Sequence, residues 1–189
     1  EKQEYMKIVS SNNELLLQLI DDILDLSKIE AGTMEFTFAP TDINELMEGI
    51  CRQMQEKNTS PDVAITFTEK ATECIFHTDR VRLSQVIINF TNNAMKFTSE
   101  GSIQMGYRID ETKDEIYFYV KDTGIGIPAD KIDEVFERFV KLNTFAKGTG
   151  LGLAICRVIV ERLEGTIGAN SREGEGSCFW FRLPMHQKV

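Results

Sequence analysis

The stretch that most constrains this chain is residues 85–98, with the sequence QVIINFTNNAMKFT. Wound as a helix at about 100° per residue, it carries a narrow polar stripe made of Gln85, Asn89, Asn93 and Lys96. Apolar side chains border both sides of the stripe: Val86, Phe90, Ala94 and Phe97 on one flank, and Ile88 and Met95 on the other. A helix that is apolar on both sides of a polar seam is expected to be largely buried.

Polar groups on such a helix need partners, because burying an unpaired amide or ammonium group costs free energy. The seam offers two carboxamide oxygens, which suit a hard cation, and one ammonium group, which suits a phosphate. The alternative is a structural helix in which Asn89 and Asn93 hydrogen-bond to neighbouring backbone. The stretch by itself leaves both interpretations open.

The overall charge excludes one class of function. The 189 residues carry a formal net charge of −9, whereas a broad nucleic-acid surface needs clustered Lys and Arg. A bound polyanion must therefore be small and held locally. The cysteines form no CxxC pair and have apolar neighbours, which predicts free, buried thiols in a reducing compartment at Cys51, Cys74, Cys156 and Cys178. No apolar run approaches the roughly 18 residues of a membrane-spanning helix.

Residues 3–30 carry one continuous helical pattern, which ends at Gly32, since glycine commonly follows the last turn of a helix. Its apolar stripe has the 4-3 spacing of a coiled coil or helix bundle, through Met6, Val9, Leu16, Ile20 and Ile23. A helix with this much Leu and Ile needs a partner. The partner is the following domain, a second copy of the chain, or a helix that these residues do not include.

Alternating and helical patterns divide the remainder into an α+β unit. Helices are expected at residues 43–56 and 80–97, with Asp42 and Asp79 as N-caps, and at 130–139 and 151–163. Strands are expected at 34–38, 63–68, 74–78, 102–109, 115–121, 166–170 and 177–183. We expect hairpin pairing of 63–68 with 74–78, of 102–109 with 115–121, and of 166–170 with 177–183. Three helices should cover one face of the resulting, mostly antiparallel sheet.

The glycine-rich segment DTGIGIP, residues 122–128, directly follows a predicted strand. Gly124 and Gly126 permit a tight turn and a close approach of the backbone to a ligand. A carboxylate is a poor neighbour for phosphate but accepts well from an exocyclic amine, so Asp122 is interpreted as a base-recognition residue. The alternative is a strand-to-helix turn that Asp122 caps.

A second glycine-rich segment, KGTGLGL at residues 147–153, leads straight into a predicted helix. The free N–H groups and the positive end of the helix dipole would form an anion site at residues 150–153, suited to a triphosphate. The segment lacks the Gly-Lys-Ser/Thr of a phosphate loop and does not follow a strand, as a dinucleotide fingerprint would. By itself it is weak evidence for a nucleotide.

Between these segments lies FERF, residues 136–139, followed by Lys141. Arg138 and Lys141 could reach phosphates, and the alternative is a surface helix with amphipathic aromatic residues. Residues 142–147 are placed to form a lid over a bound nucleotide.

In this order and spacing, the four segments resemble the ATP-binding domain of sensor histidine kinases. The asparagine helix is similar to that family's N box, DTGIGIP to its G1 box, FERF to its F box and GTGLGLAI to its G2 box. LIDDILDLSKIEAG resembles the second helix of the dimerisation and phosphotransfer hairpin, and EGEGSCFWFRLP resembles the closing hairpin. The resemblance implies the Bergerat fold, a two-layer α/β sandwich of about five mostly antiparallel strands with three helices on one face, preceded by a long helix.

The resemblance also implies ATP and Mg²⁺ as cofactors. Asn93, together with Asn89, would hold the metal, while Lys96 would face the phosphates. Asp122 would accept a hydrogen bond from the adenine amino group. The full set of implied ATP-binding residues is Asn89, Asn93, Lys96, Phe97, Asp122, Gly124, Gly126, Phe136, Arg138, Lys141, Gly148, Thr149, Gly150, Leu151, Gly152 and Leu153.

The domain boundary implied by the resemblance lies near Gly32: residues 1–32 are the second hairpin helix and residues 33–189 the catalytic domain. The parent would form a homodimer through the hairpin helices and pass its phosphate to the receiver domain of a response regulator. The domain itself would be cytoplasmic. Most sensors of the family are anchored in the inner membrane, and the sequence leaves open whether this parent is.

The chain departs from the family pattern at the phosphoacceptor, a histidine followed by an acidic residue on the first hairpin helix. The histidines here are His77, which Thr78 follows, and His186, which Gln187 follows. Neither has that context, so both are interpreted as structural or solvent-facing. We expect the first hairpin helix to lie outside these residues.

Two rival functions remain. An ATPase of the gyrase, mismatch-repair or chaperone type has the same fold but carries a glutamate where this chain has Asn89, and an amide cannot take a proton from water. A non-catalytic scaffold that dimerises through residues 3–30 would have lost nucleotide binding.

We predict that these 189 residues bind ATP without phosphorylating themselves, because no histidine here has the phosphoacceptor context. Incubation with γ-labelled ATP should leave the chain unlabelled. An acid-labile label on the chain would contradict the prediction.

Overall fold

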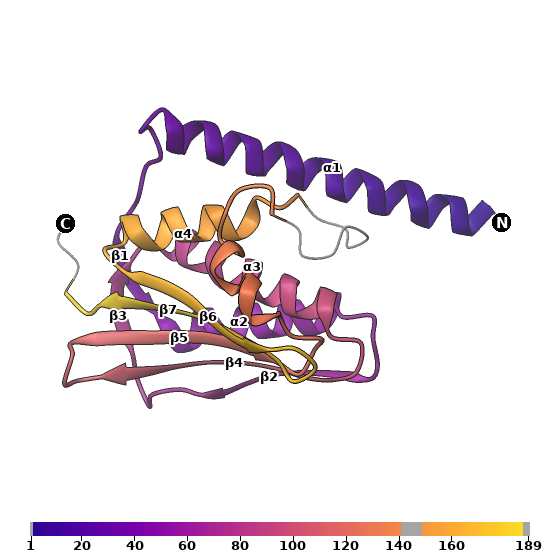
Figure 1. Cartoon of the computed structure of the whole chain (residues 1–189). Helices are drawn as coiled ribbons and strands as arrows, with labels where there is room; N and C mark the ends of the chain where they lie inside the picture. The colour runs from indigo at the N-terminus through magenta and orange to yellow at the C-terminus, as the bar shows by residue number, and fades with distance from the viewer. Residues whose placement is uncertain (1, 141–148, 187–189) are drawn as a thin grey trace.

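The computed structural model describes residues 2–140 and 149–186, and the chain forms a two-layer α/β sandwich with a long helix lying across it (Figure 1). The helices are α1 (Lys2–Glu30), α2 (Ile43–Lys57), α3 (Arg80–Phe97) and α4 (Gly152–Arg162), with one 3-10 segment, η1 (Ala129–Glu134). The strands are β1 (Ala39–Asp42), β2 (Val63–Glu69), β3 (Ile75–Thr78), β4 (Gly101–Asp110), β5 (Glu115–Asp122), β6 (Thr166–Arg172) and β7 (Gly176–Pro184).

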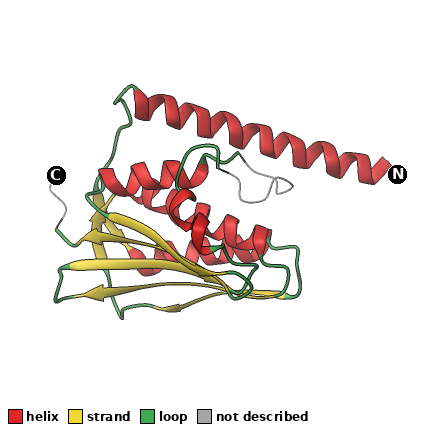
Figure 2. Cartoon of the chain, viewed as in Figure 1, coloured by secondary structure: helices red, strands yellow, loops and turns green. Residues whose placement is uncertain are grey.

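Five strands form the main sheet in the order β2-β4-β5-β7-β6. β2 runs parallel to β4, and the other neighbours are antiparallel. Helices α2, α3 and α4 cover one face of this sheet, as Figure 2 shows. The expected fold class is therefore confirmed, as are the hairpins β4–β5 and β6–β7. β1 and β3 form a separate antiparallel pair that was not expected.

Two strand predictions are wrong. Residues 34–38 form no strand, because their alternating apolar side chains pack the segment against the body: Met34 is buried and the rings of Phe36 and Phe38 stack on each other. Residues 63–68 and 74–78 do not pair, since β2 joins β4 and β3 joins β1. Alternation indicates one buried and one exposed side of an extended segment, but it determines neither whether the segment joins a sheet nor which strand it pairs with.

A helix prediction also fails. Residues 130–139 form the short η1 and then turns instead of an α-helix. Phe139 has a φ of 63°, a left-handed conformation that a continuing helix does not contain.

Helix α3 is the centre of the core, as its two apolar flanks require. Phe90 is fully buried, and its ring lies 5.4 Å from that of Phe179 and 6.0 Å from that of Phe181, both on β7. Cys51, Cys74 and Cys156 are free and buried as expected, whereas Cys178 is free but only half-buried. Among the described residues, none of the helices has the length and hydropathy of a membrane span.

Asp79 joins the beginning of α3 to the linker from α1. Its buried carboxylate accepts hydrogen bonds from the backbone N–H groups of Val81 and Arg82 at 2.9 Å, which caps the helix as predicted. Its second oxygen accepts from the N–H of Thr37 at 2.7 Å. One side chain therefore positions both the central helix and the segment that leads into the domain.

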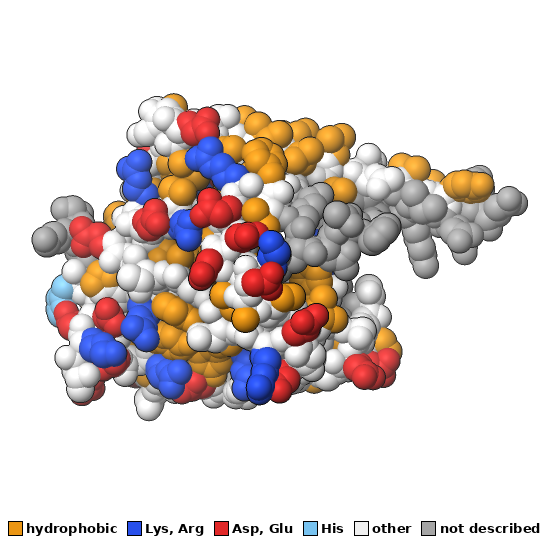
Figure 3. Space-filling view, viewed as in Figure 1, with side chains coloured by type: hydrophobic (Ala, Val, Ile, Leu, Met, Phe, Trp, Pro, Cys, Tyr) orange, Lys and Arg blue, Asp and Glu red, His pale blue; other side chains and the backbone are white. Residues whose placement is uncertain are grey.

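Helix α1 has two apolar faces. Leu26 and Ile29 pack against the core of the domain, on the same face as the buried Asp22. The predicted coiled-coil stripe is turned away from the domain, and its members Met6, Val9, Leu16, Ile20 and Ile23 are 45% to 67% exposed. Figure 3 shows hydrophobic side chains gathered along this helix. The described part of the domain therefore does not cover the stripe, and the alternatives that remain are a second copy of the chain or a helix outside these residues.

The two N-caps give a stability prediction. Asp79→Ala should lower the free energy of unfolding by about 2–4 kcal/mol, because it removes the cap and leaves the N–H of Thr37 without its acceptor. The matched control is Asp42→Ala, which removes one bond to the N–H of Glu45 at an exposed cap of α2 and should cost about 1 kcal/mol. Urea denaturation of both variants measures the difference. Equal losses would contradict the structural role given to Asp79.

Candidate functional site

The polar stripe of α3 lies beside the first turn of α4. Asn89 faces Gly152 so closely that any side chain at residue 152 would overlap its carboxamide. Asn93, one turn further along α3, is half-buried, as Asn89 is. Neither carboxamide makes a hydrogen bond within residues 2–140 and 149–186. The alternative in which both asparagines bond to neighbouring backbone therefore does not hold for the described part of the chain.

The two ends of the stripe have different neighbours. Lys96 is exposed, and its Nζ lies 4.9 Å from the centroid of the Phe97 ring. Gln85, at the other end, donates through Nε2 to Asp25 of α1 at 2.7 Å. The stripe therefore contacts α1 at Gln85 and α4 at Asn89.

Asp122 ends β5 and shapes the turn that follows it. Its buried carboxylate accepts through Oδ1 from the backbone N–H of Gly124 at 2.8 Å and of Ser177 at 3.3 Å. Burial raises the pKa of this carboxyl, and the two N–H groups oppose the shift. No hydrogen bond to Oδ2 occurs among the described residues. Asp122 does cap a turn, as the alternative states, and it keeps one acceptor oxygen for another donor.

The C-terminal end of α3 lies against this same turn. The carbonyl of Phe97 accepts from the N–H of Ile125 at 3.2 Å, and a side chain at residue 124 would overlap that carbonyl. The hydroxyl of Thr98 is completely buried beside Gly124 and has no hydrogen-bond partner in the described residues. The predicted residues Phe97, Asp122 and Gly124 are therefore neighbours, with an unsatisfied hydroxyl among them.

The β6–β7 hairpin supports the turn from the other side. Gly126 has a φ of 68°, and a Cβ there would overlap the carbonyl of Arg172. The N–H of Ile127 donates to the Ser171 hydroxyl at 2.8 Å, and the N–H of Gly174 donates to the carbonyl of Ile125 at 2.8 Å. Sequence analysis missed Ser171, Ser177 and Thr98, because nothing in their local sequence indicates which loop they contact.

The second glycine-rich segment approaches α4 as predicted. The Thr149 hydroxyl accepts from the N–H of Leu151 at 3.2 Å, and Gly150 has a φ of 73°. The side chain of Leu151 is fully buried, so only its backbone can face a ligand, whereas Gly152 and Leu153 are half-buried at the helix start. Gly148 and residues 142–147 lie outside the described residues.

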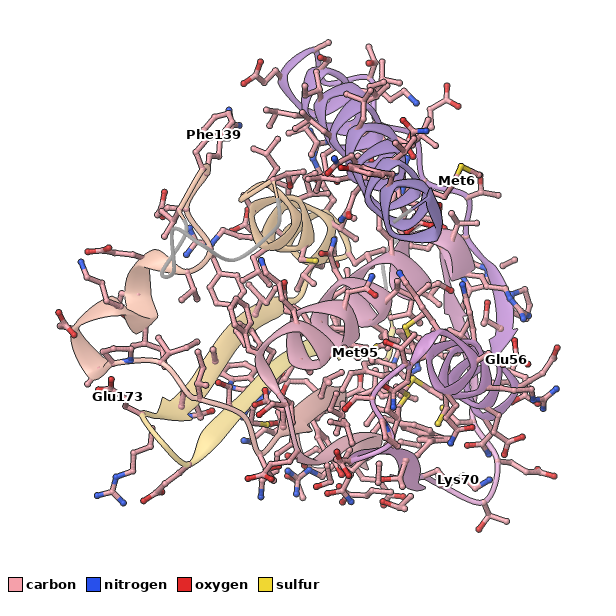
Figure 4. The ribbon with its side chains drawn as sticks, turned by 90° about the vertical axis from the view of Figure 1, so that its right-hand side faces the viewer. Met6, Glu56, Lys70, Met95, Phe139 and Glu173 are labelled. Carbon is pink, nitrogen blue, oxygen red and sulfur yellow. The ribbon has the colours of Figure 1, made fainter. Side chains whose placement is uncertain are left out.

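The FERF segment contacts this glycine-rich segment at Gly150. Phe136 is buried, with its ring 6.1 Å from that of Phe179, and the N–H of Phe139 donates to the carbonyl of Gly150 at 2.8 Å. The Phe139 side chain is 68% exposed and projects outward (Figure 4). Arg138 forms an ion pair with Glu30 of α1. Lys141 lies outside the described residues.

The two glycine-rich segments thus meet α3 at two points, Asn89 and Phe97. Eight residues of α-helix separate these points, which is about 12 Å along the helix axis. One end presents a carboxylate oxygen and a hydroxyl, and the other presents the Asn89 carboxamide beside the positive end of α4. The arrangement suits an elongated ligand with a hydrogen-bond donor at one end and an anion at the other.

A hollow of 560 Å³ lies elsewhere, on the face of the sheet opposite α3. The guanidinium of Arg108 stacks 4.7 Å from the Tyr117 ring centroid, and that of Arg182 lies 5.2 Å from Trp180. The two guanidinium groups therefore pack on aromatic rings in this part of the sheet. None of the predicted site residues lines the hollow.

Comparison with known proteins identifies relatives of the chain. Residues 78–187 match the family described as histidine kinase-, DNA gyrase B- and HSP90-like ATPases. The hybrid signal transduction histidine kinase K of Dictyostelium discoideum is 35% identical over 206 residues, which cover 99% of this chain and 17% of that protein. The chain spans only 17% to 23% of the length of the first such curated relatives.

Solved structures agree in fold. Full-length ShkA in complex with AMPPNP has a TM-score of 0.85 and 28% identity, over 99% of this chain and 39% of that one. The catalytic domain of the histidine kinase ThkA has a TM-score of 0.68 and 31% identity, over 80% of this chain and 97% of that one. ThkA in complex with the response regulator protein TrrA has a TM-score of 0.77 and 26% identity, over 97% of this chain and 51% of that one.

The contact of Gly126 with the β6–β7 hairpin gives a prediction. Gly126→Ala should lower the free energy of unfolding by about 2–4 kcal/mol, because the left-handed φ is strained for alanine and its Cβ would overlap Arg172. Gly174→Ala is the control: its φ of 80° gives similar strain but its Cβ would meet open space, so about 1 kcal/mol is expected. Chemical denaturation distinguishes the two, and equal costs would mean that the hairpin does not confine the turn.

Proposed function

The chain belongs to the family of histidine kinase-, DNA gyrase B- and HSP90-like ATPases, and we propose that it is the ATP-binding catalytic part of a sensor histidine kinase. In this proposal the parent transfers the γ-phosphate of ATP to a histidine on a hairpin helix, for relay to an aspartate of a response regulator. The observation that carries the proposal is the pair of carboxamides, Asn89 and Asn93, which make no hydrogen bond within the described residues, with Asn89 directly beside the glycine-rich start of α4.

The residues near Asp122 fit adenine. Oδ2 of Asp122, which has no hydrogen bond among the described residues, is an acceptor for the exocyclic amino group, and the Thr98 hydroxyl, likewise without a partner there, lies beside the same Gly124. Buried polar atoms without partners are costly, so a ligand that supplies a donor would lower this cost. Gly124 and Gly126 allow the backbone to pass closely beside a flat ring.

The opposite end fits a triphosphate with a divalent cation. Asn89 and Asn93 present hard oxygen ligands one helical turn apart, and Mg²⁺ typically completes its coordination with phosphate oxygens and water. Bound there, the metal would supply charge neutralisation on the phosphates. The N–H groups at residues 150–153 and the ammonium of Lys96 would add positive potential at the same end.

Catalysis by this chain would consist of positioning and charge compensation. The N-terminal end of α4 and Lys96 would offset the charge of the phosphates, and the asparagines would orient them through the metal. Phe136 is buried against Phe179 and anchors the FERF segment, whose Phe139 bonds to Gly150. No general base lies on α3, since an amide occupies position 89. The nucleophile, an imidazole nitrogen, would come from another helix.

The remaining parts of the proposal concern the parent protein. Residues 1–32 would be the second hairpin helix and residues 33–189 the catalytic domain. The exposed stripe of α1 supports dimerisation through a helix bundle. The ThkA structure was solved with a response regulator, which supports a receiver domain as the partner here. The domain would act in the cytoplasm, in a parent that is membrane-anchored if it follows most sensors.

An ATPase of the same fold is the second candidate, because the matching family includes gyrase- and HSP90-like enzymes. Asn89 disfavours it, since a carboxamide cannot activate water. Steady-state ATP hydrolysis distinguishes the two, and rapid turnover by the purified chain would support the ATPase.

We predict that ATP with Mg²⁺ at about 100 times its dissociation constant stabilises the chain by about 2.7 kcal/mol, whereas GTP does not. Guanine carries an oxygen where adenine carries the amino group that Asp122 would accept. Asn93→Ala should abolish the ATP-dependent rise in melting temperature. Asn92→Ala is the matched control, because Asn92 bonds to Lys57 instead of facing the site, and it should retain the full shift. Equal shifts with ATP and GTP, or loss in both variants, would contradict the proposed site.

A further inference from the structure

Helix α1 contacts the candidate nucleotide site through a buried carboxylate. Asp22 is only 6% exposed, although it lies on a helix whose other faces are largely in solvent. Its Oδ2 accepts a hydrogen bond from the Thr149 hydroxyl at 2.6 Å, across 127 residues of sequence. Burial raises the pKa of Asp22, and the bond from Thr149 opposes this shift. Thr149 is the one hydrogen-bond donor to Asp22 among the described residues, and a buried carboxylate with one neutral donor is an incompletely satisfied group.

The partner of Asp22 belongs to the glycine-rich loop. Thr149 precedes α4 directly, and its hydroxyl also accepts from the N–H of Leu151. That N–H is one of the donors at the start of α4 that the proposed function assigns to the phosphates. In the structure the N–H of Leu151 donates to the Thr149 hydroxyl, and that hydroxyl donates to Asp22 of α1.

The charge of Asp22 also acts on this end of α4. The carboxylate lies near Cys156 in the second turn, where it adds to the effect of burial in raising the pKa of that thiol. A negative charge near a helix N-terminus is favourable, and a second anion placed nearby is repelled by the first. The N-terminal end of α4 would therefore attract both Asp22 and the phosphates of a nucleotide, and these two anions would repel each other.

Two further acidic residues hold α1 in place. Asp25 pairs with Arg82 at 3.3 Å and accepts from Gln85 at 2.7 Å, both on α3. Glu30 pairs with Arg138, one of the residues predicted to reach phosphates. With α1 docked, the loop before α4, the start of α3 and the FERF segment are each bonded to an acidic residue of α1.

From these contacts we propose that Asp22 is a positioning residue through which docked α1 competes with nucleotide for the start of α4. Nucleotide binding then weakens the docking of α1, and docking weakens nucleotide binding by the same factor, because the coupling between two binding equilibria is reciprocal. The inference rests on the proposed function, since it requires that phosphates bind at residues 149–153.

The test compares Asp22→Asn with Asp21→Asn in the 189-residue chain. Asp21 is exposed on the same turn, so its variant changes the net charge equally without touching Thr149. Calorimetric titration with Mg²⁺-AMPPNP should show Asp22→Asn binding about 5- to 20-fold more tightly than wild type, a typical coupling between two sites. Asp21→Asn should bind as wild type does.

Hydrogen exchange gives a second, independent readout. In wild type, adding Mg²⁺-AMPPNP should speed amide exchange in residues 19–29, and in Asp22→Asn this segment should already exchange faster without nucleotide. Unchanged or weaker affinity in Asp22→Asn, or slower exchange in residues 19–29 on binding, overturns the competition while leaving the proposed function intact. If wild type and both variants all fail to bind, the proposed function fails and the competition fails with it.

Discussion

The close approach of α4 to the polar stripe of α3 is the constraint on which the rest of the structure depends. Gly152 packs directly against Asn89, and any side chain there would force the helices apart. Helix α3 cannot rotate to relieve the contact, because rotation would expose Phe90 and the other apolar residues packed on β7. The Asn89 carboxamide is therefore held at the start of α4, where the N–H groups of a helix favour an anion, and Asn93 lies one turn further along α3.

Three buried aspartates connect this arrangement to the surrounding segments. Asp79 holds the linker from α1 against the start of α3, Asp122 shapes the turn after β5, and Asp22 holds the loop before α4. Each accepts from backbone N–H groups or a hydroxyl, because a buried carboxylate without donors would be strongly unfavourable. The segments that carry these donors are consequently fixed relative to one another, so the position of α1 and the geometry of the site are linked.

Local sequence patterns predicted most of the helices and strands, but they did not predict which strands pair or which loops contact each other. The bounds of α3, Arg80–Phe97, agree with the prediction, since the aspartate cap directly precedes the helix and the apolar periodicity runs along it. The parallel pairing of β2 with β4 was not predicted. It depends on how the strands pack beneath α2 and α3, and no residue pattern within either strand indicates it. Residues 34–38 alternate like a strand, yet their apolar side chains serve to pack a linker. The candidate site residues Asn89, Asp122 and Gly152 could be proposed from their segments, whereas their neighbours Thr98, Ser171 and Ser177 could not.

The sequence by itself determined which chemical groups are available: a helix with two carboxamides in an apolar frame, two glycine-rich turns and their order along the chain. These follow from residue types and spacing, which act over a few residues at a time. The tertiary structure alone decided that the coiled-coil stripe of α1 faces away from the domain and that Asp22 meets Thr149. Contacts between residues 127 positions apart depend on how whole elements pack, and helical periodicity cannot say which of two apolar faces will be covered.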